Sequence, residues 1–207
     1  MFGVFEEVGD ILRELGLRKR GHDVVPNFCG WLSVSDYMKK CTKPEIAYFA
    51  AIAMETGGRI SELLSYRSTM FKYSKTENGL EVIKCEGLPV LKKGAKASAT
   101  KKIRNIMIPV TEPLVTDMME GVSSAYKKPR LFPWKDRTYV WRLITKTDPK
   151  WWPHRFRTER ASQLVVEYGF DVALLMIFFN WSRAEEAVGY VRLSAEDIVN
   201  KMVKKNV

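Results

Sequence analysis

Three short clusters, far apart in the chain, supply residue types that can do chemistry on a phosphodiester. Residues 56–63 read TGGRISEL and include Arg59; His154 and Arg157 follow about a hundred residues later, and Tyr190 comes last. Guanidiniums neutralise the non-bridging oxygens of a phosphodiester and contact them bidentately, which a lysine ammonium cannot do. A tyrosine hydroxyl can attack the phosphorus and hold the cut strand as a covalent ester. The set therefore indicates phosphoryl transfer on a nucleic-acid backbone.

These clusters resemble the motifs of the tyrosine recombinases, the phage-type integrases. The first motif of that family reads T-G-x-R-[IV]-S-E-L and is matched by residues 56–63. The second motif, H-x-x-R, is matched by His154 and Arg157. The family then has a His or Trp with the nucleophilic tyrosine nine residues later, a spacing that Trp181 and Tyr190 keep. Each motif alone is weak, but all of them in order make a strong signal.

The resemblance implies a mechanism in which Tyr190 attacks a DNA phosphodiester and forms a 3′-phosphotyrosyl bond. Arg59, His154, Arg157 and Trp181 would stabilise the pentavalent phosphorus, where negative charge grows on the non-bridging oxygens. A 5′-hydroxyl from a partner duplex then reverses the step, so that no cofactor and no metal ion are implied. The implied partner is a double-stranded attachment site, bound by a homo-tetramer of a protein that is a monomer without DNA.

The general acid of the family is a lysine on a β-hairpin, which protonates the departing 5′-oxygen. Val90–Gly94 resembles the usual strand ending in Lys-Gly, so Lys93 is the first candidate for this role. Lys84, Lys96 and Lys101 remain open because this hairpin is longer than usual. Lys96 and Lys101 are also candidates for contacts with DNA phosphates.

A second candidate for DNA contact is the helix that we expect over residues 136–146. Arg137 and Arg142 flank the aromatic Trp141 on it, a combination that could place a helix against DNA. Other functions stay open at this level. A topoisomerase of type IB uses similar chemistry on one duplex, and a catalytically silent DNA-binding module could keep the same fold.

Structural roles compete with the catalytic ones at several of these positions. Arg59 in isolation would be an ordinary surface arginine, and Trp181 beside Phe178 and Phe179 could simply pack in the core. We expect Glu62 to support the first motif by packing and hydrogen bonding rather than to act as an acid or base.

The chain also departs from the family pattern. Gly58 replaces a branched residue, Asn180 replaces a glycine before Trp181, and Glu159 lies just beyond Arg157. Only about thirty residues precede the matched region, fewer than the N-terminal DNA-clamping domain that the resemblance implies would need. Residues 1–31 are expected to form a helix and linker, and residues 32–207 the catalytic domain. The chain is then either a catalytic fragment or a short integrase of the kind that archaeal viruses and plasmids carry.

Hydrophobic periodicity predicts the elements that must position these groups. A β-rich stretch should lie between residues 68 and 110, with a hairpin turn at Asn78-Gly79 and strand-like runs at residues 70–73, 80–84, 90–92 and 103–108. The remainder should be helical, which gives an α+β fold, mostly helical with a small antiparallel sheet. The expected helices cover residues 4–17, 33–40, 43–55, a segment beginning at Arg59, 111–126, 136–146, a segment from His154 to Tyr168, 172–179, a short segment from Ser182 and 194–204.

Composition sets the outer bounds on function. Lysine and arginine exceed aspartate and glutamate by 34 − 24 = 10, and a net charge of +10 favours polyanionic partners. Three cysteines without the paired spacing of zinc ligands indicate reduced thiols in a cytoplasmic protein. No apolar run reaches the ~20 residues that span a bilayer, and the acidic residues near the N-terminus exclude a signal peptide.

Overall fold

The computed structural model describes residues 30–91 and 102–190 of the chain. Several sequence predictions lie outside the described residues: the helices over residues 4–17 and 194–204, and the three hairpin lysines Lys93, Lys96 and Lys101. The division of the chain between residues 31 and 32 stays a prediction.

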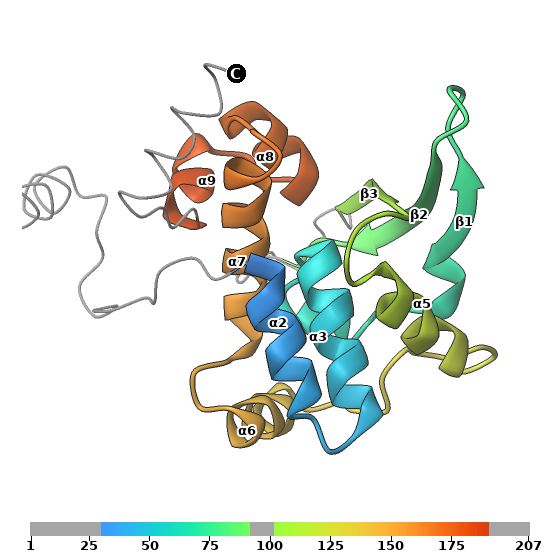
Figure 1. The fold of residues 1–207 in the computed structure, drawn as a ribbon, viewed down its shortest axis with the longest axis vertical. Coiled ribbons are helices and arrows are strands. Elements are labelled where there is room, and N and C mark those ends of the chain that lie inside the picture. The colour runs from blue at the N-terminus through green and yellow to red at the C-terminus, as the bar shows by residue number, and fades with distance from the viewer. Residues whose placement is uncertain (1–29, 92–101, 191–207) are drawn as a thin grey trace, which may run out of the picture.

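The centre of the fold is a group of three helices, α2 (Gly30–Lys39), α3 (Pro44–Thr56) and α7 (Pro153–Val166), which pack on one another (Figure 1). Pro44 and Pro153 stand in the first turns of α3 and α7, where the missing N–H is not needed. From Phe49 onward α3 is buried on all sides, as expected for a helix without a polar face. Its position makes α3 the rigid support of the segment that follows it.

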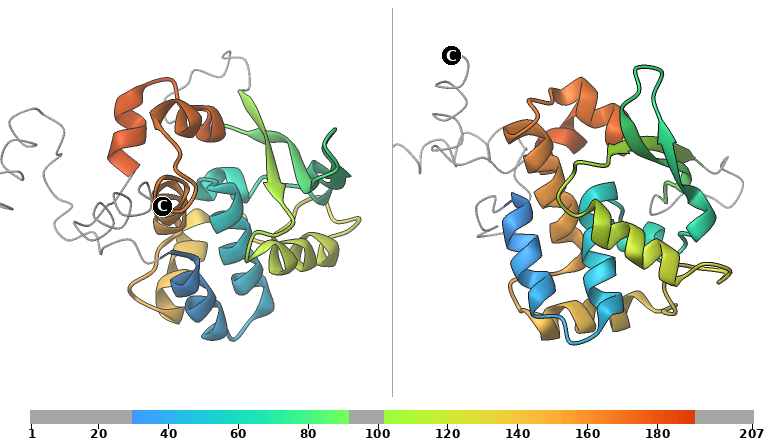
Figure 2. Two further views of the ribbon diagram at one scale, coloured as in Figure 1. Left: turned by 45° about the horizontal axis from the view of Figure 1, so that its top comes forward. Right: turned by 45° about the vertical axis from the view of Figure 1, so that its right-hand side comes forward.

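A three-stranded antiparallel sheet flanks this helical group, as two further views show (Figure 2). The strands pair in the order β1–β2–β3, with Phe71 opposite Cys85 on the first pair of strands. Side chains of β3 alternate between buried and exposed, so one face of the sheet covers the core. The strands are β1 (Phe71–Lys75), β2 (Glu81–Pro89) and β3 (Ile103–Pro109), preceded by the 3₁₀ turn η1 (Ser68–Met70).

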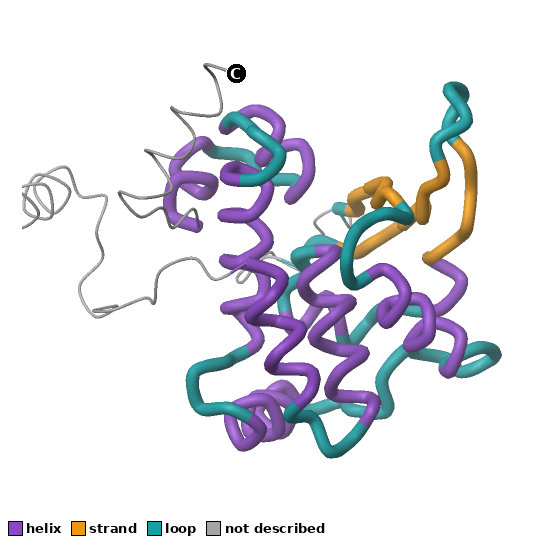
Figure 3. The backbone as a smooth tube through the Cα atoms, viewed as in Figure 1, coloured by secondary structure: helices purple, strands orange, loops and turns teal. Residues whose placement is uncertain are grey.

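The other helices close the two ends of the molecule. α6 (Arg137–Thr147) lies at one end of α7, and α8 (Val172–Phe179) and α9 (Ala184–Tyr190) lie at the other (Figure 1). α5 (Val115–Ser124) packs against α3. The arrangement of helices around one small sheet is plain in the backbone trace (Figure 3). The predicted α+β class, mostly helical with a small antiparallel sheet, is confirmed.

Two element predictions were wrong in detail. Val90 and Leu91 form no separate strand, because β2 continues to Pro89 around a bulge at which Gly87 adopts a positive φ of 69°. The helix expected from residue 111 begins at Val115, because Pro113 disfavours helical backbone in the residue before it.

The core is largely one cluster of buried side chains between α2, α3, the sheet, α5 and α6. A smaller cluster joins the second half of α7 to α8 and to the beginning of α9. Along the described ranges, no helix is long and apolar enough to cross a membrane. Cys41 and Cys85 are free thiols.

Candidate active site

The turn between α3 and α4 (Ile60–Leu63) places Arg59 at the centre of the site. Gly57 ends α3 in the left-handed conformation, with a φ of 60°, and its N–H bonds to Ala53 O. A side chain at Gly57 would strain this conformation and would also collide with the ring of Phe179. Arg59 follows as the N-cap residue of α4, as the sequence predicts.

Glu62 holds Arg59 in place. Its carboxylate accepts hydrogen bonds from the Arg59 backbone N–H at 2.8 Å and from Arg59 Nη1 at 3.1 Å. It also accepts the backbone N–H of Leu91 at 3.2 Å, which ties the end of the β2 segment to the same point. The side chain is only 1% exposed. Glu62 therefore supports the motif from behind, in agreement with the sequence-based interpretation.

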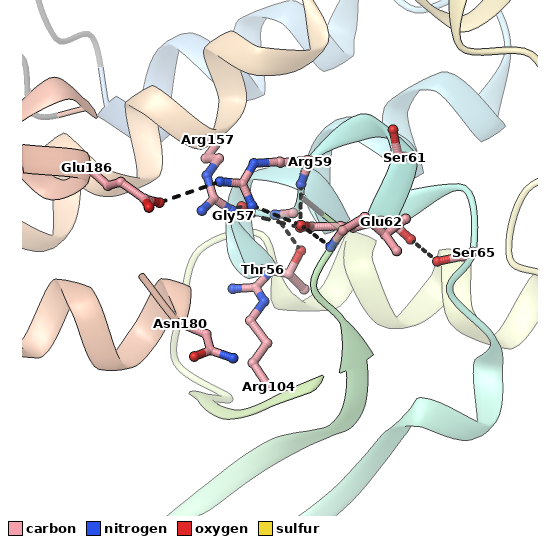
Figure 4. Close-up of polar contacts among 12 residues, drawn as sticks. Thr56, Gly57, Arg59, Ser61, Glu62, Ser65, Arg104, Arg157, Asn180 and Glu186 are labelled. Atoms are coloured by element: carbon pink, nitrogen blue, oxygen red, sulfur yellow. Dashed lines mark hydrogen bonds and ion pairs between the residues drawn. The ribbon is translucent and has the colours of Figure 1, made fainter. Parts of the chain in front are cut away.

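Arg157 comes from α7 and meets the same turn. Its Nη1 donates to Gly57 O at 2.5 Å, a contact between residues 100 positions apart, and lies 3.9 Å from Glu62 Oε2. The two guanidiniums of Arg59 and Arg157 thus share one carboxylate and one turn (Figure 4). Arg59 is 24% exposed, whereas the Arg157 side chain is fully buried. A phosphate could reach Arg157 only after a local rearrangement.

Aromatic rings cover the other side of Arg157. The Phe179 ring lies 4.6 Å from the Arg157 guanidinium carbon and the Trp181 ring 5.2 Å from it. Phe179 and Trp181 stack on each other with centroids 4.4 Å apart. Asn180 between them has a left-handed φ of 52°, which asparagine tolerates far better than most residues. That conformation explains why Asn180 can stand where the family pattern has glycine.

His154 lies in the first turn of α7, one turn before Arg157, and is exposed. The two residues share one helix, as predicted, and Arg157 reaches the turn at Gly57. Glu159, the residue that departs from the family pattern, bonds to Arg155 at 3.1 Å inside the fold. Its role is structural.

Tyr190 is the last residue of α9, and its side chain lies outside what the structure describes. One turn earlier on the same helix, Glu186 Oε2 lies 3.9 Å from Arg59 Nη2 (Figure 4). Sequence reasoning missed Glu186. A carboxylate carries the same kind of oxygen that a phosphate would present to Arg59, and it brings α9 into contact with the Arg59 guanidinium.

Sequence reasoning also missed Arg104 on β3. This arginine is 4% exposed and occupies an inward position of the sheet, where Ile106 and Ile108 follow it. Its Nη2 donates to the Tyr66 hydroxyl and its Nη1 to Phe178 O, both at 3.2 Å. Burial raises the pKa of the Tyr66 phenol, whereas the charge of Arg104 lowers it. One signal was present in the sequence: a charged residue at an apolar position of an alternating strand.

The predicted DNA-contacting arginines lie on α6, apart from the guanidinium pair. Arg137 and Arg142 are exposed, and Trp141 between them is 50% exposed. Arg137 Nη1 donates to the hydroxyl of Ser61 on α4 at 3.1 Å, which links this helix to the Arg59 motif. Within the part of the chain that is described, no group of three or more His, Cys, Asp or Glu residues could hold a metal ion.

Comparisons by sequence find no matching family model and no matching curated protein. Solved structures do match the fold. XerA recombinase matches with a TM-score of 0.61 and 12% identity, over 98% of this chain and 74% of that chain. XerH site-specific recombinase, bound to palindromic difH substrate in a post-cleavage complex, matches with a TM-score of 0.61 and 15% identity, over 89% of this chain and 54% of that chain.

A third match is the Tn1549 transposon integrase in complex with transposon right end DNA. Its TM-score is 0.55 at 13% identity, over 94% of this chain and 69% of that chain. This chain therefore spans about half to three quarters of the proteins that it matches. The described helices and sheet have the fold of the tyrosine recombinase catalytic domain.

Proposed function

We propose that this protein is a site-specific DNA recombinase, an integrase that cleaves and rejoins strands through a 3′-phosphotyrosyl intermediate. The observation that supports it most is the convergence of Arg59 and Arg157 on the Gly57 turn, within a fold shared with recombinases. Two guanidiniums at one position suit a phosphodiester whose charge increases in the transition state.

The proposed roles are those that the sequence motifs imply, and the convergence of Arg59 and Arg157 supports two of them. Tyr190 is the nucleophile, Arg59 and Arg157 bind the non-bridging oxygens, and His154 and Trp181 complete the set. Trp181 also packs against Arg157 and so keeps its guanidinium in place. The general acid is assigned to Lys93, which lies outside the described residues.

The partner that we propose is a double-stranded attachment site, bound by a tetramer of the protein. A net charge of +10 supports a polyanionic partner. Two of the similar structures, XerH and the Tn1549 integrase, contain DNA. Arg137 and Arg142 are the proposed backbone contacts on α6, and Lys96 and Lys101 those on the hairpin.

The test is covalent capture on nicked duplexes. Cleavage near the nick releases a short fragment that diffuses away, so the strand cannot be rejoined and the protein stays attached to the DNA. A library of duplexes with randomised sequence around the nick covers every candidate attachment site, and the captured DNA reveals which one is cleaved. We expect an adduct with the natural protein, none with Tyr190→Phe, and an unchanged yield with Tyr126→Phe. Tyr126 is 71% exposed in the turn after α5, so this control removes one phenol oxygen elsewhere.

The outcomes separate the competing functions. An adduct with Tyr190→Phe would assign the nucleophile to another tyrosine, and no adduct with any duplex would favour a silent DNA-binding module. Where an adduct forms, joining of two duplexes identifies a recombinase, whereas relaxation of supercoiled plasmid without strand exchange identifies a topoisomerase.

A further inference from the structure

Arg104 is a buried cation on the inward face of β3. Its neighbours on the inward face of β3 are apolar, and a buried charge is costly unless an anion or several hydrogen bonds compensate it. Among the residues that the structure describes, Arg104 makes no ion pair, and its Nε has no hydrogen-bond partner. Two neutral acceptors, the Tyr66 hydroxyl and Phe178 O, are what its guanidinium holds.

Both acceptors lie close to the turn that carries Arg59, one directly and one through the next residue. The Tyr66 hydroxyl lies against Gly58, since a Cβ on Gly58 would be 2.7 Å from that oxygen. Phe178 precedes Phe179, whose ring packs against Gly57 and stacks on the Arg157 guanidinium. Figure 4 shows Arg104 reaching from β3 toward Thr56 and the guanidinium pair.

We propose that Arg104 is a positioning residue for the reaction and acts through Tyr66 and Phe178. Its guanidinium bonds both to the Tyr66 hydroxyl, which lies against Gly58, and to Phe178 O, next to the ring that covers Arg157. These two bonds together set the distance between Arg59 and Arg157. This inference rests on the proposed function, because that spacing matters only if both guanidiniums bind one phosphate. The planar fork of arginine spans two acceptors at once, and a lysine ammonium would not reproduce that geometry.

Gly58 fits this interpretation. The family pattern has a branched residue at this position, but here such a side chain would also meet Leu63 Cδ2, 2.9 Å from an ideal Cβ. Glycine leaves room for the Tyr66 hydroxyl to touch the backbone between Gly57 and Arg59. The Tyr66 hydroxyl, held by Arg104, therefore occupies the space that the branched side chain at position 58 fills in the usual motif.

The first test compares two buried tyrosines that each lose a hydroxyl. Tyr66→Phe breaks the bond to Arg104, and the matched control Tyr37→Phe breaks a bond to Ile144 O in the helical layer. Both rings are almost fully buried, at 0% and 1% exposure. Single-turnover cleavage at saturating nicked DNA should slow by about tenfold or more in Tyr66→Phe, since small misplacements of binding groups are costly. Tyr37→Phe should change the melting temperature but not the cleavage rate.

The second test separates geometry from charge. Arg104→Lys keeps the charge, yet it should slow cleavage as Tyr66→Phe does, with DNA affinity little changed. The double variant should be no slower than the slower single variant, because both changes break the same link. A wild-type rate for Arg104→Lys, or additive losses in the double variant, would overturn the proposal. If Arg104→Lys fails to fold, the comparison of the two tyrosines still decides.

A third readout does not depend on activity. The Arg157 Nε–H resonance of the DNA-free protein should shift in Tyr66→Phe and stay in place in Tyr37→Phe. An unmoved resonance in both variants would contradict the positioning role. Failure of the proposed function is a different result, namely no covalent adduct with the natural protein on any duplex. If the natural protein forms the adduct and Tyr66→Phe and Arg104→Lys cleave at the natural rate, the positioning role of Arg104 is wrong and the proposed function still stands.

Discussion

At the scale of single residues, the contact between Glu186 and Arg59 has the clearest consequence. The carboxylate lies 3.9 Å from the guanidinium, and the two side chains are 27% and 24% exposed. A DNA phosphate that binds Arg59 bidentately must compete with this carboxylate for the charge of the guanidinium. DNA binding and movement of α9 are therefore expected to occur together.

Glu186→Gln should strengthen DNA binding more than Glu185→Gln does. Each change removes one negative charge from the same turn of α9, but only Glu186 contacts Arg59, whereas Glu185 is exposed. Partly exposed ion pairs contribute about 0.2–1 kcal/mol, so the extra gain should be a few-fold. Equilibrium binding of nicked duplex in a Tyr190→Phe background measures it without cleavage. Equal gains in the two variants would show that only net charge matters.

The sequence motifs found the residues whose types perform the proposed chemistry. Arg59, Arg157 and Trp181 do converge, from the turn between α3 and α4, from α7 and from the segment just after α8. Glu186 and Arg104 were missed for a physical reason. Their contacts join segments from distant parts of the chain. The alternation along β3 marks Arg104 as inward-facing, but no local pattern reports which residues Arg104 or Glu186 meets.

At the scale of elements, a buried charge cluster joins α3 and α7 to the segment that precedes α5. Arg160 on α7 bonds to Glu112 at 2.6 Å and lies 3.4 Å from Glu55 on α3. The pKa of Glu55 is raised to about 7, mainly by burial; the charge of Arg160 opposes this rise and that of Glu112 adds to it. Two carboxylates that share one guanidinium cannot both ionise without cost.

The stability of the protein should consequently fall as the pH rises toward 7. The folded-state pKa of Glu55 lies above its unfolded value of 4.5, so its stabilising effect is complete below pH 4.5 and disappears as the pH passes about 7. One proton changes the free energy of unfolding by at most about 1.4 kcal/mol per pH unit. Glu55→Gln should flatten urea-unfolding free energies between pH 5 and 8. If the free energy of unfolding of Glu55→Gln depends on pH as steeply as that of the natural protein, a group other than Glu55 causes the pH dependence.

Local sequence rules predicted the ends of elements more often than they predicted contacts between elements. Gly57 and Gly169 both adopt positive φ angles directly or shortly after helices, where the sequence predicts their ends. The bulge between Cys85 and Leu88 was beyond reach, because it depends on pairing with β3 and leaves only Gly87 as a local sign. The register of a sheet is a property of two strands together.

At the scale of the whole molecule, the net charge of +10 should govern how the protein binds the DNA partner that we propose. Many basic side chains are exposed on α6 and in the turn before it, among them Arg130, Lys135, Arg137 and Arg142. Contacts of this kind release counterions from the duplex and carry little sequence information. Phosphate contacts should therefore dominate the affinity of these 207 residues for duplex DNA.

Duplex binding by this chain should weaken steeply with salt and discriminate modestly between sequences. Each phosphate contact contributes roughly −0.9 to the slope of log K against log salt concentration. Arg137→Gln should reduce the steepness by about one contact if Arg137 binds a phosphate. Titrations between low and physiological salt measure the slope. A salt-insensitive and tightly specific complex would contradict this expectation.

The fit of Gly58 against the Tyr66 hydroxyl has an evolutionary consequence. A branched residue at position 58 and a tyrosine at position 66 cannot occupy the same space, because an ideal Cβ on Gly58 lies 2.7 Å from that oxygen. Relatives of this chain should therefore change the two positions together: those with valine or isoleucine at 58 should have a shorter side chain at 66. Where Tyr66 is lost, Arg104 loses an acceptor and becomes a buried charge that selection should replace with an apolar residue. An alignment of relatives tests this expectation: positions 58, 66 and 104 should covary, and independent variation would contradict it.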